Sequence, residues 1–348
     1  CFDNTRCYSF FSPLLSSFGF DLHHVHSHTE LQRVRKLDVG AEAHVALEVE
    51  FGVCIMELCQ DGANQILILW RTVVLIVLEA GNDVALANKE TLVTAGELVN
   101  KAIREKGLRL LPVDSEHSAI FQSLMGVPKG NIYKILLTAS GGPFYGKKRE
   151  DLVNITPADA LHNPNWDMGA KVTIDSSTLV NKGLEMIEAK WLFDIPMDKI
   201  EVVVHRQSVL HSAVEFVDNA VIAQLGMPDM RVPIQYALTY PNRMSIQRNE
   251  LDLTEYASLT FEKPDTKTFY ALELARKAGI EGGTLATVFN AADEAAVELF
   301  LKGELSYLGI SEAIEYAMNE HNNIKNPTLS DIYDADQEAR EAVYKRRK

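Results

Sequence analysis

Residues 84–106, VALANKETLVTAGELVNKAIREK, decide the fold class of the chain. They begin with a short apolar run, Val84-Ala85-Leu86-Ala87, whose length and composition indicate a buried strand. From Glu90 to Lys106 the apolar residues recur at the spacing of an amphipathic helix. Because a buried strand that leads directly into a helix is the repeating unit of α/β proteins, we expect an α/β domain here.

The alternation of strands and helices continues beyond Lys106. Further strands are predicted at Leu108–Val113, Ile132–Thr138, Lys171–Asp175, Ile200–His205, Ala213–Val217 and Val221–Gln224. Further helices are predicted at His117–Leu124 and from the capping residues Ser176 and Ser177 to Phe193. After a connection over Pro241–Pro264, four more helices are predicted, at Lys267–Lys277, Ala286–Leu301, Ser311–Asn319 and Ser330–Lys345. The pattern predicts an α/β protein with a helical domain at its C-terminal end.

Size, charge and cysteine content exclude several classes of function. With 348 residues the chain is long enough for two or three domains. The net charge of -14 argues against a nucleic-acid partner, because binding to the phosphate backbone requires a basic surface. An anionic small molecule is still compatible with this charge, since a local cluster of Lys and Ser side chains can bind a phosphate. The four cysteines form no C-x-x-C pair and the first residues lack signal-peptide features, so we expect a reducing, cytoplasmic location and no membrane partner.

Residues 1 to 78 show no clean period. Four histidines, at positions 23, 24, 26 and 28, lie in a polar stretch that favours a solvated loop over a metal site. The apolar stretch Ile66–Leu78 is too short to span a bilayer and indicates a buried strand or a core helix. We expect the first 60 residues to make few contacts with the rest of the chain, and Ile66–Leu78 to cover the sheet as one improvised strand.

Polar side chains at two places suggest a metal site. Asp114 and Glu116 follow a predicted strand, and carboxylates two apart in an extended chain face the same way. Glu185 lies in a predicted helix, three residues after Lys182 and four after Asn181, so the three share one helix face. Carboxylates without His or Cys favour Mg²⁺ or Mn²⁺. The alternatives are a solvated acidic turn at Asp114 and an exposed ion pair at Lys182.

Two further segments suggest anion binding. Ser140-Gly141-Gly142 follows a predicted strand, and glycines there let backbone N–H groups turn toward an anion. Asn88-Lys89-Glu90 lies where a strand passes into a helix, so Lys89 can meet an oxyanion near the helix N-terminus. An ordinary first-turn charge is the alternative for Lys89. Taken alone, these residues indicate an α/β protein with a carboxylate metal site and nearby anion-binding groups.

From about Gly81 to its end, the chain resembles the 1-deoxy-D-xylulose 5-phosphate reductoisomerase family. The resemblance is carried by ordered motifs at family spacing: Leu86-Ala87-Asn88-Lys89-Glu90-Thr91-Leu92-Val93, Leu111-Pro112-Val113-Asp114-Ser115-Glu116-His117, Thr138-Ala139-Ser140-Gly141-Gly142-Pro143-Phe144, Asp175-Ser176, Asn181-Lys182-Gly183-Leu184-Glu185, Gln224-Leu225-Gly226, Pro228-Asp229-Met230-Arg231 and Asn290-Ala291-Ala292. The resemblance implies a homodimer with an NADPH-binding domain over 1–112, a catalytic domain over 113–245, a linker over 246–266 and a helical domain over 267–348.

The resemblance also implies roles for individual residues. The metal ligands would be Asp114, Glu116 and Glu185, binding Mg²⁺ or Mn²⁺, with Co²⁺ as a further possibility. The catalytic residues would be Lys89, Glu116 and Glu185. The phosphosugar substrate would be bound by Lys89, Ser115, Glu116, Ser140, Ser176, Asn181, Lys182 and Glu185. NADPH would contact Asn88, Glu90 and Gly169, and Trp166 would lie on a mobile loop over the site.

The implied reaction is metal-dependent rearrangement and NADPH-dependent reduction of 1-deoxy-D-xylulose 5-phosphate to 2-C-methyl-D-erythritol 4-phosphate, a step of isoprenoid biosynthesis.

Two features depart from the family. Residues 1–78 contain no glycine-rich dinucleotide turn, so the Rossmann-like N-terminal domain is expected to be incomplete and to bind NADPH poorly. Asn163 stands where the family has histidine, with His162 before it. The alternative function is a non-catalytic remnant that binds phosphosugar and metal but not NADPH.

Overall fold

The predicted strand and helix over residues 84–106 are both present in the structure, a computed structural model. It describes residues 35–38, 44–50, 53–58, 73–128, 130–162, 168–246 and 250–346. Strand β4 (Asp83–Leu86) leads into helix α3 (Lys89–Lys106), and the side chain of Asn88 caps this helix by accepting a hydrogen bond from the Thr91 amide at 3.1 Å. Gly107, with a φ of 66°, ends the helix in the left-handed conformation that glycine adopts readily.

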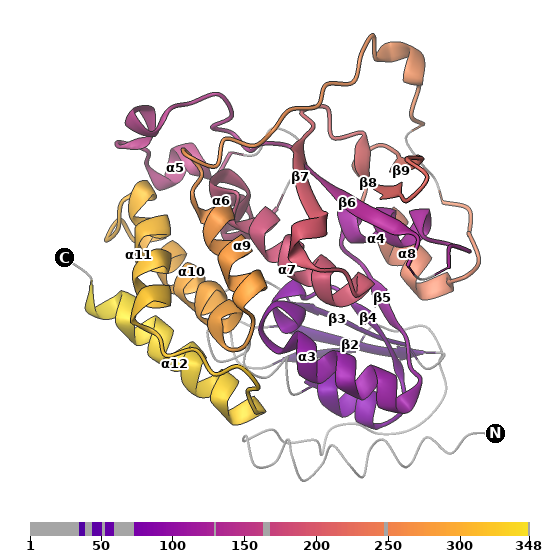
Figure 1. The fold of residues 1–348 in the computed structure, drawn as a ribbon, viewed down its shortest axis with the longest axis horizontal. Coiled ribbons are helices and arrows are strands. Elements are labelled where there is room, and N and C mark those ends of the chain that lie inside the picture. Colours follow the sequence, from indigo (N-terminus) through magenta and orange to yellow (C-terminus); the bar gives the residue numbers. More distant parts are fainter. Residues whose placement is uncertain are drawn as a thin grey trace. The chain divides into compact units, whose positions relative to one another are not determined.

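The first sheet contains five strands in the order β1-β2-β3-β4-β5 (Figure 1). The strands other than β4 are β1 (Arg35–Asp38), β2 (His44–Glu50), β3 (Val53–Leu58) and β5 (Leu110–Pro112). Strands β2 and β3 are antiparallel, whereas β3, β4 and β5 run parallel. The expectation that the first 60 residues make few contacts with the rest is therefore wrong for β3, which pairs with β4 from Val53↔Asp83 to Ile55↔Ala85.

The improvised strand expected over Ile66–Leu78 is also wrong for the part that is described. Residues 73–79 are helical, and residues 66–72 lie outside the described part of the chain. Val74 and Leu78 are fully buried and pack with Leu86 and Leu92 in one apolar cluster. Residues 73–79 thus cover the sheet as a core helix, which was the other interpretation of the apolar stretch.

The second sheet contains β6 (Ile132–Ala139), β7 (Ile200–Val204), β8 (Leu210–Phe216) and β9 (Val221–Leu225) in the order β7-β6-β8-β9. Strand β6 is parallel to β7 and antiparallel to β8, and β8 is antiparallel to β9. Helix α4 (Ser115–Ser123) packs on β8 and β9. This sheet therefore stands behind the segment that carries Asp114 and Glu116.

The strand predicted at Lys171–Asp175 is a helix. Helix α6 (Ala170–Thr178) includes it, and helix α7 (Val180–Phe193) follows after Leu179, whose φ is 63°. The β-branched run of Val172, Thr173 and Ile174 favours a strand, but Ile174 is fully buried, and the Thr173 hydroxyl donates to the Gly169 carbonyl at 2.9 Å. Tertiary packing therefore overrides local propensity, and Ser176 and Ser177 lie inside α6 instead of capping the next helix.

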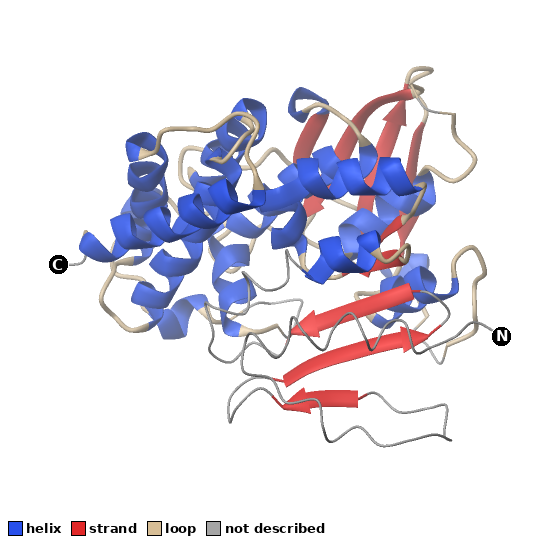
Figure 2. Ribbon diagram, turned by 90° about the horizontal axis from the view of Figure 1, so that it is seen from below, coloured by secondary structure: helices blue, strands red, loops and turns tan. Residues whose placement is uncertain are grey.

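The C-terminal region is helical, as predicted. It contains α9 (Ala271–Glu281), α10 (Leu285–Leu301), α11 (Tyr307–Glu320) and α12 (Leu329–Lys345), drawn in orange and yellow in Figure 1. Helix α10 is buried on nearly every side and packs against α3, α9, α11 and α12. The fold is thus a mixed α/β protein with a helical C-terminal region, and Figure 2 shows these helices beside the strands of the two sheets.

Several short elements and one longer helix complete the described part. They are η1 (Arg149–Leu152), α5 (Pro157–Ala160), η2 (Met197–Lys199), α8 (Arg231–Thr239) and η3 (Leu253–Glu255). Helix α8 was not predicted from the sequence. The helices that the structure describes are too short or too polar to cross a membrane.

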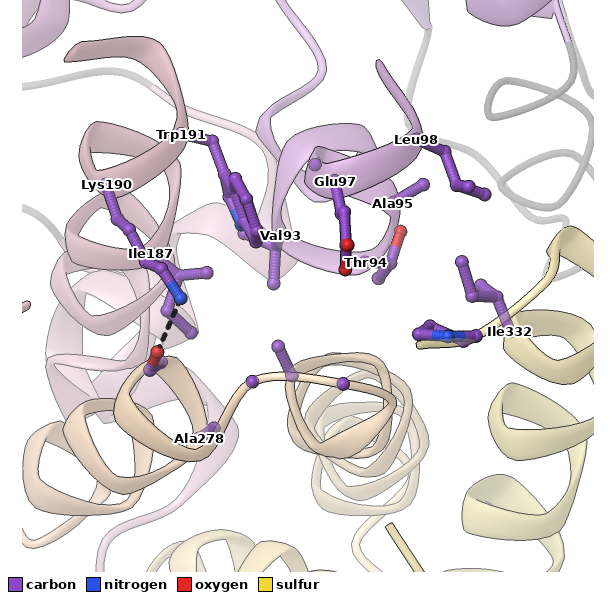
Figure 3. Close-up of a pocket in the computed structure, with 16 residues that line it drawn as sticks. Val93, Thr94, Ala95, Glu97, Leu98, Ile187, Lys190, Trp191, Ala278 and Ile332 are labelled. Atoms are coloured by element: carbon purple, nitrogen blue, oxygen red, sulfur yellow. Dashed lines mark hydrogen bonds between the residues drawn. The ribbon is translucent and has the colours of Figure 1, made fainter. Parts of the chain in front are cut away.

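Two glycines allow helices to approach closely. A Cβ atom on Gly183 of α7 would lie 2.5 Å from Cβ of Ala275 on α9, and a Cβ on Gly96 of α3 would lie 2.4 Å from the ring of Trp191. Beside Trp191, residues of α3, α7, α9, α10 and α12 line a cavity of about 20 Å³, where Lys190 donates to the Gly279 carbonyl at 2.9 Å (Figure 3). Close packing against α3 and α9 thus fixes the position of α7, the helix that carries Asn181, Lys182 and Glu185.

Candidate functional site

Asp114 sits between strand β5 and helix α4. Its side chain caps α4 by accepting hydrogen bonds from the amides of Glu116 at 3.0 Å and His117 at 3.3 Å. Glu116 therefore lies in the first turn of a helix, not in an extended segment as the sequence argument assumed. Asp114 and Glu116 are close because Asp114 caps the helix turn that contains Glu116. Lysines from other helices, Lys89 and Lys182, each contact one of the two carboxylates.

Helix α7 supplies the second half of the site. The amide of Asn181 donates to Glu185 Oε1 at 2.5 Å, and the ammonium of Lys182 donates to Glu185 Oε2 at 2.5 Å. Lys182 and Glu185 are buried, and Asn181 is partly buried. The shared helix face that the spacing predicted is thus turned inward, and the interpretation as an exposed ion pair is wrong.

Three carboxylates and two lysines meet between α3, α4 and α7. Asp114, Glu116 and Glu185 each present an oxygen atom, and these atoms lie within 4.8 Å of one another. Lys89 Nζ lies 2.9 Å from Asp114 Oδ2 and 3.2 Å from Glu185 Oε1, and Lys182 Nζ lies 3.1 Å from Glu116 Oε1. Lys89 also donates to Asn181 Oδ1 at 2.9 Å. The cluster joins residues up to 96 positions apart in the chain.

Burial and charge shift the titration of these groups. Burial and the charge of Asp114 raise the pKa of Glu185 above its usual value. Burial alone would raise the pKa of Asp114, but the positive charges of Lys89 and His117 outweigh it and hold this pKa well below the usual range. Burial likewise lowers the pKa of Lys89 less than Asp114 and Glu185 raise it, so this lysine stays an ammonium ion.

His117 and Glu188 form a layer behind the carboxylates that the sequence argument missed. His117 Nδ1 lies 3.1 Å from Asp114 Oδ1 and 3.2 Å from Glu188 Oε2, and its Nε2 lies 3.0 Å from the carbonyl oxygen of Glu185. Burial lowers the pKa of His117, but the charges of Glu188 and Asp114 raise it to about 9. The spacing of three residues from Asp114 to His117, and from Glu185 to Glu188, was the available signal.

The segment around Ser140 approaches the end of α6. A Cβ atom on Gly142, whose φ is 68°, would lie 2.8 Å from the carbonyl oxygen of Ser176, so only glycine allows this contact. Arg206 holds the segment by donating to the carbonyls of Ser140 at 2.6 Å and Gly142 at 2.9 Å. Binding of a phosphosugar by Ser140, Ser176, Asn181 and Lys182, which the family resemblance implies, stays a prediction.

The remaining predicted residues lie at helix starts or beside the carboxylates. Ser115 donates to Glu116 Oε2 at 2.6 Å. Asn88 and Glu90 lie at the N-terminus of α3, and Gly169 is the residue before the first turn of α6. Asn163 and Trp166 lie outside the described residues, whereas His162 beside them is described and exposed. The loop predicted over the site is therefore not described.

The donor chemistry fits a hard divalent cation. All three candidate ligands are carboxylates, and Mg²⁺ and Mn²⁺ prefer oxygen ligands. A second group with convergent ligand atoms, Asp114, His117 and Glu188, shares Asp114 with the first. His117 contacts Asp114 in the way that outer partners commonly orient the side chains that bind a metal.

Comparisons with known proteins agree on one family. A family model described as the 1-deoxy-D-xylulose 5-phosphate reductoisomerase C-terminal domain matches residues 110–193. A model described as the DXP reductoisomerase C-terminal domain matches residues 225–342. The matched ranges include Asp114, Glu116 and Glu185.

Relatives and solved structures cover most of the chain. The 1-deoxy-D-xylulose 5-phosphate reductoisomerase of Thermoanaerobacter pseudethanolicus is 57% identical over 270 residues, which are 77% of this chain and 71% of the relative. That of Symbiobacterium thermophilum is 58% identical over 269 residues, 77% of this chain and 69% of the relative.

Among solved structures, the Zymomonas mobilis enzyme in complex with NADPH has a TM-score of 0.75 at 42% identity, covering 79% of this chain and 72% of that one. A DOX-P reductoisomerase in complex with NADPH, fosmidomycin and magnesium has a TM-score of 0.74 at 38% identity, covering 78% and 71%. The sequence and the fold of this chain are thus similar to the same enzyme. The chain belongs to the 1-deoxy-D-xylulose 5-phosphate reductoisomerase family.

Proposed function

We propose that this chain converts 1-deoxy-D-xylulose 5-phosphate to 2-C-methyl-D-erythritol 4-phosphate, as an NADP-dependent oxidoreductase of isoprenoid biosynthesis. The observation that carries the proposal is the partly buried cluster in which Asp114, Glu116 and Glu185 meet Lys89 and Lys182. Carboxylates suit a divalent cation and lysines suit a phosphosugar, so one site offers both. Membership of the family supports this reading over a non-catalytic remnant.

Asp114, Glu116 and Glu185 would hold Mg²⁺ or Mn²⁺, with Co²⁺ as a further possibility. When bound, the ion would polarise and orient substrate oxygens as a Lewis acid. His117 would keep Asp114 in place, because its ring contacts both Asp114 and the Glu185 carbonyl. The solved relatives with bound magnesium support a divalent ion in this family.

Substrate binding would use the two lysines and the short polar side chains near them. Lys89 and Lys182 stay charged, because nearby carboxylates raise the pKa of each more than burial lowers it. Their ammonium groups would bind oxygens of the substrate, and Lys89 with Glu116 and Glu185 would form the catalytic set. The substrate-binding set would be completed by Ser115, Ser140, Ser176 and Asn181.

NADPH would contact Asn88, Glu90 and Gly169. These residues lie at the N-termini of α3 and α6, where backbone N–H groups favour anions.

We propose domains over 1–112, 113–245 and 267–348 with a linker over 246–266, the first being an incomplete Rossmann-like domain. The homodimer and the cytoplasmic location also stay predictions.

The experiment is an assay of NADPH oxidation by the purified chain with substrate and Mg²⁺. Oxidation that requires both the substrate and the metal supports the proposal. Binding of substrate and Mn²⁺ without any oxidation at saturating NADPH would instead identify the chain as a non-catalytic remnant. A parallel assay with Glu185→Gln separates oxidation at this site from a contaminating activity.

A further inference from the structure

A second buried cluster of charges lies between α6 and the C-terminal helices. Lys171 of α6 donates to Asp175 Oδ2 on the same helix at 2.5 Å and to Asp293 Oδ2 on α10 at 3.0 Å. Asp175 and Asp293 are 2% and 0% exposed, and their Oδ1 atoms have no hydrogen-bond partner among the described residues. Lys171 therefore provides the direct ionic link from α6 to α10.

The cluster continues into α12. On α10, Asn290 donates to Glu294 Oε1 at 2.8 Å, and Glu294 Oε2 is paired with Arg340 of α12. Arg340 in turn donates to Asp336 at 2.6 Å. Two adjacent carboxylates of α10 are thus paired with cations on neighbouring helices, Asp293 with Lys171 and Glu294 with Arg340. The proposed reaction involves neither pair.

Lys171 supplies the positive charge between two buried acidic side chains, Asp175 on α6 and Asp293 on α10. Burial and the charge of Asp293 raise the pKa of Asp175 to about 8, because a second negative charge is unfavourable in this buried cluster. Burial lowers the pKa of Lys171, but Asp175 and Asp293 outweigh it and raise this pKa well above the usual value. Without the lysine, the link to α6 is lost and the buried carboxylate of Asp293 is left without its cation.

Helix α6 also places the candidate substrate residue Ser176. Ser176 directly follows Asp175, and its carbonyl oxygen is the atom that Gly142 approaches. The neighbouring carbonyl, of Ser177, accepts a hydrogen bond from Tyr307 of α11 at 2.8 Å. The C-terminal helices therefore hold α6 at both of its ends, through Lys171 at the start and Tyr307 at the finish.

We propose that Lys171, held between Asp175 and Asp293, is a positioning residue that keeps Ser176 where it binds the substrate phosphate. The inference rests on the proposed function, since it needs a phosphosugar at Ser176. It assigns the C-terminal helices a part in substrate binding through one ionic link. Loss of that link lets α6 move away from α10, and the Ser176 hydroxyl moves with it.

The test compares steady-state kinetics of the full-length parent with those of Lys171→Met, which keeps the length of the side chain and removes its charge. We expect KM for 1-deoxy-D-xylulose 5-phosphate to rise roughly 10-fold, the loss typical of one misplaced hydrogen bond to a charged group, and kcat to change far less. Lys171→Arg, which keeps the charge, should recover most of the parental KM. Lys302→Met, just after the end of α10, is the matched control, because Lys302 is an exposed lysine paired with Glu298.

A double-mutant cycle separates positioning from general destabilisation. If Lys171 acts through Ser176, Lys171→Met should change KM less than about two-fold in a Ser176→Ala background. Mn²⁺ affinity at the carboxylates should equal that of the parent, because Lys171 contacts none of the three candidate ligands. A full 10-fold effect of Lys171→Met in the Ser176→Ala background would overturn the proposal.

A second variant guards against misfolding of Lys171→Met. Asp293→Asn keeps the shape of the side chain and removes the charge on α10, so we expect a KM increase of about three-fold. If both variants leave KM within the error of the parent, the proposal is also overturned. Absence of turnover in the parent itself would instead refute the proposed function, so the two failures are distinguishable.

Discussion

His117 Nε2 lies 3.0 Å from the backbone carbonyl oxygen of Glu185, which joins α4 to α7 directly behind the carboxylate cluster. The other ring nitrogen lies 3.1 Å from Asp114 and 3.2 Å from Glu188. The imidazole of His117 therefore connects two of the three candidate metal ligands, Asp114 and Glu185, without being one of the three. The relationship explains why a buried histidine stands at this position, and it makes the stability of the site depend on pH.

The free energy of unfolding of the metal-free chain should fall as pH rises from 6.5 to 9. The pKa of His117 is raised from 6.5 to about 9, so the stability that its charge contributes is complete below pH 6.5 and is lost through pH 9. The raised pKa of Glu188, about 7 against 4.5, acts in the same direction at lower pH. Urea unfolding with a chelator present measures the effect, to which His117 contributes at most about 3 kcal/mol.

His117→Gln provides the comparison for that pH dependence. Glutamine keeps hydrogen-bonding capacity but does not titrate, so the decline between pH 6.5 and 9 should become shallower in the variant. An identical slope in the variant and the parent would contradict the assignment of this pH dependence to His117. Mn²⁺ affinity should also fall, by about 10- to 100-fold, as for other residues that orient metal ligands.

Glu185→Gln should weaken Mn²⁺ binding by at least about 10-fold, because the amide removes one of three anionic oxygen donors. Titration of the purified variant with Mn²⁺, followed by calorimetry, measures the change. Glu341→Gln is the control, since Glu341 is exposed and pairs with Lys345 and Gln337 on its own helix. Equal Mn²⁺ affinity of Glu185→Gln and the parent would show that the ion is bound elsewhere.

Gly183→Ala should destabilise the protein although alanine is the better helix former by about 1 kcal/mol. The new Cβ would lie 2.5 Å from Cβ of Ala275, and overpacking of this kind costs about 1–3 kcal/mol. Chemical unfolding of the single variants and of the pair Gly183→Ala with Ala275→Gly tests the explanation. The pair should recover stability relative to Gly183→Ala, and failure to recover would place the strain at another contact.

Local patterns in the sequence were sufficient for much of the fold. The strand and helix over 83–106 have clear periods, and the structure has both within about two residues. The β-branched residues 172–174 misled the prediction, because burial of Ile174 and the Thr173 hydrogen bond to Gly169 are tertiary and helical effects that composition does not express. Gly183 stands inside α7, where alanine is the better helix former, and the structure identifies the residue that approaches it as Ala275.

The candidate site was only partly predictable. Spacing on one helix brought together Asn181, Lys182 and Glu185, and the motif order pointed to Asp114 and Glu116. His117 and Glu188 lie on different helices, and helix-spacing rules relate each to its own neighbouring ligand but not to each other. The same limit applies to the link between Lys171 and Asp293, which joins helices that are distant in the sequence.

NADPH should bind to this chain with a dissociation constant well above the micromolar range. A dinucleotide site uses a glycine-rich turn to bring backbone N–H groups to the pyrophosphate, and Gly19, Gly40, Gly52 and Gly62 are isolated within residues 1–78. Fluorescence titration of NADPH with the purified chain measures the constant. Tight binding at micromolar concentration would contradict our interpretation of the N-terminal part.

The most direct test of the account is NADPH oxidation by the purified chain with 1-deoxy-D-xylulose 5-phosphate, Mg²⁺ and NADPH raised to saturation. We predict oxidation that depends on both the substrate and the metal, and that is lost in Glu185→Gln. Because the NADPH site is expected to be weak, the rate should keep rising at NADPH concentrations far above micromolar. No oxidation at any NADPH concentration, in a folded chain that binds Mn²⁺, would contradict the account.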